Sequence, residues 1–226
     1  MPTSPLKSQG QRSGTKDGVA MPAASPVSRA TAAVPLKRQP GRARDALVAI
    51  AAEQFNTVGY YGTDSNRIAR AAGYAPGTFY NHFPNKLAIF LEVYENWVTW
   101  EWQRVREAVT AGGDLAAIIR DLVRRVLDHH RKWRVFRASL RALSDTDPAV
   151  REARLVQRER QLRMMAELIA LLGAPPSSKA EMAIVTYTVE RACDAVADGD
   201  FQALGVSADD VVHYLETELM RLVRSA

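Results

Sequence analysis

The sequence predicts an all-α protein with two helical domains. Apolar residues recur at helical spacing between residues 42 and 223, and no segment alternates apolar and polar residues with the period of a strand. Glycines, prolines and Ser, Asp or Asn caps separate the apolar stripes. With 226 residues and 47% hydrophobic content, the chain can bury a substantial core. We expect a three-helix domain over 42–86 and a larger helical domain over 87–226.

Residues 1–41 differ in composition from the rest. They hold six of the eleven prolines and show no apolar periodicity that would offset the entropy of ordering them, so we expect a disordered tail. Residues 1–44 carry eight Lys or Arg against one acid, whereas the remainder has 22 basic and 24 acidic residues. This asymmetry favours a polyanion near the N-terminal end. The tail is either a solvated segment or an arm that adds phosphate contacts.

Composition also excludes several classes of protein. A single cysteine, Cys193, precludes an internal disulfide, and no apolar run reaches membrane-spanning length. His129 and His130 are adjacent, so on a helix they point in different directions, and no third ligand keeps a suitable spacing for a metal. We find no Ser–His–Asp grouping and no phosphate loop. We therefore expect a cytoplasmic, nucleoid-associated protein that is not an enzyme and has no metal, cofactor or membrane contact.

The first helix is expected over 42–58. It carries one apolar stripe, and Gly59 ends it. The stripe residues are Leu47, Ile50, Ala51 and Phe55.

A helix-turn-helix follows. A short helix opens at Thr63, whose side-chain oxygen is a candidate N-cap, and Gly73 ends it because glycine readily adopts the left-handed conformation of a tight turn. Pro76, at a first helical position, starts the second helix, which runs to His82. Two short helices joined through glycine form a helix-turn-helix, in which the second is the recognition helix.

At these residues the chain resembles the TetR family of bacterial transcriptional regulators. The matching spacings are F-x3-G-Y-x2-T-x4-I-A from Phe55 and A-G-x3-G-T-x-Y-x2-F-x2-K from Ala72 to Lys86. The resemblance covers about 44–90 and implies DNA binding by a three-helix domain. The chain departs from the commoner family pattern at Ala75 and Pro76, where a capping Ser and a Lys usually stand.

Small, hydrogen-bonding and basic side chains of this region are the candidate DNA contacts. By resemblance, Thr78, Tyr80 and His82 match positions that touch phosphates or bases, and Lys86 matches a lysine that meets the DNA backbone. The full candidate set is Thr63, Asn66, Arg67, Gly77, Thr78, Tyr80, Asn81, His82 and Lys86.

A long helix is expected from Asn85 to about Thr110. Its apolar residues fall on one broad arc, wide enough to touch both domains. Glu101 lies within this arc, where a carboxylate is costly unless it is paired. Either it pairs with Arg104, or it orients a ligand in a pocket walled by Trp97 and Trp100.

Two further residues are candidate polar groups of that pocket. His130 lies on the apolar face of a helix expected over 115–131, and is either a satisfied core histidine or a pocket donor. Arg137 lies on the next helix, expected over 133–143. With Trp97, Trp100 and Glu101 these residues predict a mostly apolar ligand with one polar or cationic end.

Three more helices complete the chain. One starts at Asp147–Pro148 and ends near Leu172; a capping box at Ser178 opens the next, which Gly199 ends; Ser207 caps the last. The apolar stripes of the last two are used either in the core alone or partly in a two-fold four-helix interface with a second copy. We favour the interface, because TetR-like proteins dimerise through these helices.

These observations predict a homodimeric transcriptional regulator. By resemblance, it represses by occupying a palindromic operator in double-stranded DNA and is released by a small molecule. The alternative is a DNA-binding regulator without a small ligand, controlled by a protein partner or by copy number.

Overall fold

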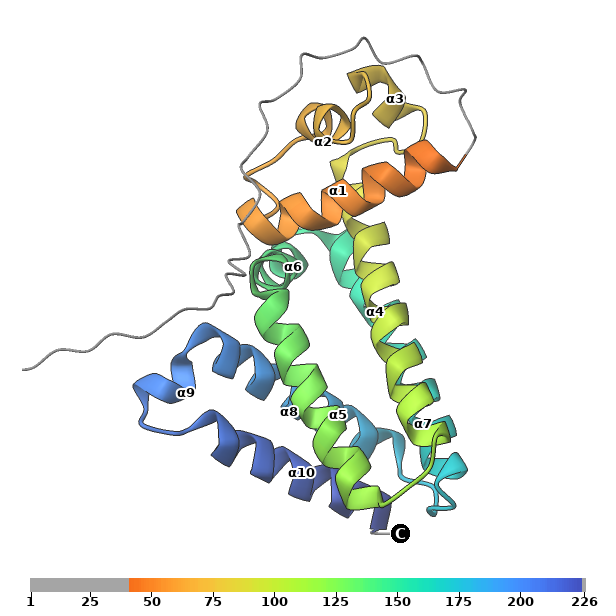
Figure 1. Ribbon diagram of the computed structural model, residues 1–226, viewed down its shortest axis with the longest axis vertical. Coiled ribbons are helices and arrows are strands. Elements are labelled where there is room, and N and C mark those ends of the chain that lie inside the picture. Colours follow the sequence, from red (N-terminus) through yellow and green to blue (C-terminus); the bar gives the residue numbers. More distant parts are fainter. Residues whose placement is uncertain (1–40, 225–226) are drawn as a thin grey trace, which may run out of the picture. The chain divides into compact units, whose positions relative to one another are not determined.

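The computed structural model describes residues 41–224, and these residues form helices and no strands (Figure 1). The predicted tail over 1–41 lies, except for Gly41, outside the described residues. The predicted all-α fold is confirmed. The helices are α1 Arg42–Val58, α2 Ser65–Ala71, α3 Pro76–Tyr80, α4 Lys86–Thr110, α5 Leu115–Lys132, α6 Arg134–Thr146, α7 Pro148–Leu171, α8 Lys179–Asp198, α9 Asp200–Ala203 and α10 Ala208–Arg224.

Most helix ends lie where the caps predict them, with one correction. Asp64, and not Thr63, caps α2: its Oδ1 accepts a hydrogen bond from the backbone N–H of Arg67 at 2.9 Å. Thr63 turns inward instead and donates to Oε1 of Gln54 in α1. The short helix α9 was not predicted; it follows Gly199, whose φ of 88° is left-handed.

Helices α1, α2 and α3 form the predicted three-helix unit. The turn between α2 and α3 contains Gly73, which has a φ of 80°. Gly62, before α2, allows a close approach of two backbone segments, because a Cβ there would lie 2.2 Å from the carbonyl oxygen of Val58. The sequence of these turns therefore fixes how α2 and α3 are presented beside α1.

An aromatic cluster joins this unit to α4 and α6. The ring of Phe90 in α4 lies 5.1 Å from the ring of Phe55 and 5.1 Å from that of Tyr60, and it stacks on Phe136 of α6 at 4.7 Å. The core around it runs without a break from Leu47 in α1 to residue 150 in α7. The core is thus continuous across residue 86, where the sequence placed a domain boundary.

The remaining helices pack around two smaller apolar clusters. Helices α5, α8 and α10 meet at a cluster that includes Val123, Cys193 and Leu215, while α7, α8 and α10 meet at a second that includes Ile169 and Leu222. Burial raises the pKa of the Cys193 thiol to about 12, so the thiol stays protonated and is a core residue. Within residues 41–224, no helix is long and apolar enough to cross a membrane.

Candidate DNA-binding surface and ligand cavity

Helix α3 divides its residues between the core and the surface. Phe79 is fully buried, and its ring contacts that of Phe83 at 5.6 Å. Tyr80 is 56% exposed although its ring touches that of Phe79. Gly77 and Asn81 are also exposed. Together with the half-buried Thr78 and His82, these residues form the outer side of α3 and of the turn that follows it.

Helix α2 adds exposed polar groups. Asn66 and Arg67 are exposed, and the guanidinium of Arg67 donates to the carbonyl oxygen of Gly62 at 2.8 Å. That bond holds the arginine side chain against the turn before α2 and leaves its other N–H groups available.

Thr63 and Lys86 have structural roles that the sequence did not reveal. Thr63 is only 4% exposed, so its side chain supports the turn and is removed from the DNA-facing set. The Nζ of Lys86 donates to the carbonyl oxygens of Tyr60, at 2.8 Å, and Thr63, at 2.9 Å. It lies 4.1 Å from the centroid of the Tyr60 ring. Burial lowers the pKa of Lys86, with Asp64 opposing the shift. Lys86 therefore ties α4 to this turn, and its contact with the DNA backbone stays a prediction.

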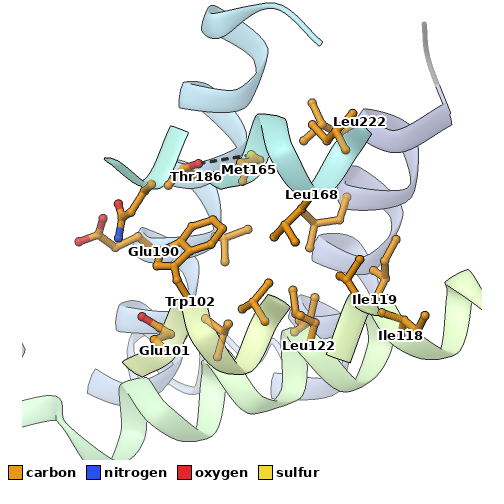
Figure 2. A pocket seen from close by; sticks show the side chains of 18 of the residues that line it. Glu101, Trp102, Ile118, Ile119, Leu122, Met165, Leu168, Thr186, Glu190 and Leu222 are labelled. Atoms are coloured by element: carbon orange, nitrogen blue, oxygen red, sulfur yellow. Dashed lines mark hydrogen bonds between the residues drawn. The ribbon is translucent and has the colours of Figure 1, made fainter. Parts of the chain in front are cut away.

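A cavity of about 170 Å³ lies among α4, α5, α7, α8 and α10. Figure 2 shows Glu101, Trp102 and Glu190 on one side of it and Ile119, Leu168 and Leu222 on the other. The lining is mostly apolar, with its charged groups gathered on the first side. The cavity can therefore take an apolar body with one polar end.

Arginines neutralise Glu190 on the polar side. It accepts hydrogen bonds from Arg137 at 3.0 Å and from Arg154 at 2.9 Å, and also pairs with Arg158. Burial alone would raise the pKa of Glu190, but the positive charges of Arg137, Arg158 and Arg154 lower it to about 2. Glu190 is therefore ionised and fully paired.

A second buried carboxylate, Asp194, binds the side chains of His130 in α5 and Arg137 in α6, the two predicted polar groups of the pocket. It accepts from Nε of Arg137 at 2.5 Å and lies 2.9 Å from Nδ1 of His130. Burial lowers the pKa of His130, against the hydrogen bond to Asp194, which raises it. His130 and Arg137 both line the cavity but are already satisfied by carboxylates. Their hydrogen bonds to carboxylates hold the polar wall in place, and few of their donors remain for a ligand.

Glu101 is the exception among the acids of this wall. The predicted pairing with Arg104 is absent, because Arg104 lies 3.5 Å from Glu107 instead. The nearest basic atom to Glu101 is Nδ1 of His129, 3.5 Å from Oε1. The carboxylate side chain is only 15% exposed. Glu101 is thus a mostly buried carboxylate without an arginine or lysine partner among the described residues.

Of the two tryptophans predicted to wall the pocket, only Trp97 lines the cavity. Trp97 lines the cavity, is 7% exposed, and also belongs to the aromatic core, where the guanidinium of Arg137 lies 5.0 Å from its ring. Trp100 is 56% exposed and does not line this cavity. Trp102 takes that place. Helical periodicity does favour Trp102, because at 100° per residue it lies closer than Trp100 to the middle of the apolar arc of α4.

The sequence also missed Glu190 and Arg158 as cavity residues. Their pairing spans 32 positions of the chain, and helical periodicity carries no information on contacts between helices so far apart.

A family comparison agrees with the helix-turn-helix geometry. Residues 47–93, from α1 into α4, match the model of the family described as "Bacterial regulatory proteins, tetR family". The helix-turn-helix region of the chain is therefore similar to the DNA-binding region of TetR-family transcriptional regulators. Regulators of this family are DNA-binding proteins and not enzymes.

Solved structures share the fold of this chain. A Mesorhizobium loti protein assigned to the family has a TM-score of 0.64 at 18% identity, over 83% of this chain and 98% of its own. FadR from Thermus thermophilus, a repressor in complex with lauroyl-CoA, has a TM-score of 0.59 at 21% identity, over 80% and 93%. A Saccharomonospora viridis protein in complex with choline has a TM-score of 0.59 at 20% identity, over 77% and 94%. A comparison with curated proteins gives no match.

Proposed function

We propose that this regulator is a repressor that binds a palindromic operator as a homodimer and is released by a small, mostly apolar molecule. The observation that carries the proposal is the polarised cavity behind α4, the helix that begins directly after the helix-turn-helix. An occupant of that cavity touches α4 and therefore acts on the element that holds α1, α2 and α3.

The outer side of α3 is the proposed DNA-reading surface. Side chains there donate and accept hydrogen bonds, and its glycine allows close approach to a phosphate backbone. The proposed contacts are Asn66, Arg67, Gly77, Thr78, Tyr80, Asn81 and His82.

Replacing Tyr80 with Ala tests this surface. Loss of a hydrogen bond from the exposed phenol to a charged phosphate should weaken binding to any DNA duplex by roughly tenfold. The salt dependence should stay the same, because the phenol is neutral and releases no counterion. Fluorescence anisotropy with a labelled duplex at several salt concentrations measures both quantities.

The matched control is Tyr61→Ala, which removes a tyrosine that is 78% exposed but lies outside the proposed surface. Equal losses in the two variants, or none in Tyr80→Ala, would remove Tyr80 from the DNA-reading surface.

The cavity volume points to a compact ligand. A cavity of about 150 Å³ in another protein holds a benzene-sized molecule, and the cavity here is about 170 Å³. The polar end of the ligand should face Glu101, because the other charged groups of that wall are paired. Release requires that the ligand bind the DNA-free conformation more tightly than the DNA-bound one.

Filling the cavity tests ligand release. Ile118→Trp adds an indole to the apolar side from a half-buried position, so it should abolish binding of toluene, a neutral molecule of the size that this cavity can hold. DNA affinity should remain, and toluene should no longer lower it. Calorimetric titration, repeated in the presence of a duplex, gives both values.

Val156→Trp is the control, because Val156 is 44% exposed and lies outside the cavity. If wild-type protein binds neither toluene nor any other small apolar molecule, control by a protein partner or by copy number becomes the better account.

The proposed dimer uses the outer faces of α8 and α10. Most of their predicted stripe residues are used in the core, but Ile184 is 66% exposed, Tyr187 48% and Tyr214 57%. Residues of both helices also line a groove that contains Ile184 and Tyr214. Packing two copies of this pair of helices about a two-fold axis would bury these side chains and place two α3 helices for a palindromic site.

Ile184→Lys tests the interface. A buried lysine without a partner is costly, so the variant should dissociate into monomers at concentrations where the wild type is dimeric. Sedimentation velocity reports the mass of each form, with Val156→Lys on α7 as the control. A wild-type monomer, or a dimer unaffected by Ile184→Lys, would contradict this interface.

A further inference from the structure

A second hollow, of about 560 Å³, is bounded by α1, α4 and α5 and shares Trp97 and Glu101 with the inner cavity. We call it the tryptophan groove. Trp97 and Trp100 from α4 and Trp133 after α5 contribute to its lining, as does His129. The His129 ring lies 5.1 Å from that of Trp97, 5.3 Å from that of Trp100 and 6.1 Å from that of Trp133. Three indoles thus gather around one point of the groove.

Glu101 is the mostly buried carboxylate of this groove. It lines both hollows, and among the described residues the basic group that lies close to it is His129. The indole N–H of Trp97 donates to Nε2 of His129, so in the neutral ring the proton is on Nδ1. That Nδ1 has no hydrogen-bond partner in the described structure, and at 3.5 Å it lies too far from Glu101 to satisfy it. The carboxylate of Glu101 therefore has no strong hydrogen-bond partner from His129 in the described structure.

Three cations, Arg104, Arg125 and the exposed Lys132, line the groove together with the acids Glu101 and Asp128, and among the described residues none of the three pairs with Glu101. Arg125 pairs with Asp121 at 2.6 Å, outside the groove lining. Arg104 pairs with Glu107, and its guanidinium lies 5.8 Å from the centroid of the Trp100 ring. This contact is exposed, so a ligand cation would compete with Arg104 for the Trp100 ring.

We propose that the tryptophan groove binds an organic monocation, a quaternary ammonium or a compact aromatic cation, seated on Trp100 and Trp133 beside Glu101. Indole faces attract cations most strongly among the aromatic side chains, and an unpaired carboxylate adds an attraction that no neutral molecule shares. An inorganic cation would gain little from the apolar walls, whereas an organic cation buries its hydrocarbon surface there.

The groove differs from the inner cavity in what it touches. Val48, Ala49 and Ala52 of α1 form one of its walls, whereas no residue of α1 lines the inner cavity. Its occupant therefore contacts the DNA-binding unit directly. Trp100 and Trp133 do not line the inner cavity, so this site can be tested apart from the proposed function.

Benzyltrimethylammonium is a suitable probe for full-length protein, with neopentylbenzene as its neutral isostere. The wild type should bind the cation more tightly than the isostere, as measured by quenching of tryptophan fluorescence and by calorimetry. Trp100→Ala should weaken cation binding about fivefold or more, and Glu101→Gln by a similar factor. Tyr61→Ala and Ile118→Trp should leave it unchanged.

The outcomes separate the alternatives. Equal affinity for the two probes, or unchanged cation affinity in both Trp100→Ala and Glu101→Gln, would overturn the proposal. Loss of cation binding in Ile118→Trp but not in Trp100→Ala would place the cation in the inner cavity and would also overturn it. Circular dichroism confirms that each variant is folded.

Discussion

The contacts of Phe90 hold the DNA-binding unit to the rest of the molecule. Its ring touches Phe55 and Tyr60 on one side and stacks on Phe136 of α6 on the other. Fully buried aromatic side chains contribute a large apolar area, and removing one from such a core typically costs about 3–5 kcal/mol. The orientation of α1 relative to α4 and α6 therefore follows from this packing.

Helix α6 extends the connection to the cavity. Phe136 enters the aromatic core, and the next residue, Arg137, pairs with Asp194 and Glu190 of α8. Removing one partner of a buried pair leaves an uncompensated charge and costs about 3–5 kcal/mol, so α6 and α8 are held together firmly. At the other side of α6, the Ser139 hydroxyl accepts from the backbone N–H of Tyr60 at 3.0 Å. A displacement of the polar cavity wall can therefore be passed through α6 to the turn before α2, because α6 contacts both.

The local features of this fold were predictable from sequence, whereas contacts between distant helices were not. Asn85, Asp114 and Ser178 cap helices as expected, because capping depends on residues only three positions apart. Thr63 does not cap α2, because the carboxylate of the adjacent Asp64 accepts the hydrogen bond from the first turn of that helix instead. The position of Glu101 on the apolar face of α4 marks it in the sequence as an unusual carboxylate. The sequence does not show that it lacks an arginine partner, because Arg104 could pair with either Glu101 or Glu107, and in the structure it pairs with Glu107. The carboxylates that satisfy Arg137 lie 53 and 57 positions away, beyond any periodic signal.

The central claim is that the DNA-binding helices and the cavity wall share one core and act as one unit. Native-state hydrogen exchange tests it most directly, because it gives an opening free energy for each amide. Core amides of α1 and α6 should open with the same free energy in the wild type, and Phe90→Ala should lower both by about 3–5 kcal/mol. If α1 opens at a much lower free energy than α6, and Phe90→Ala changes only one of them, the two parts are independent and the account is contradicted.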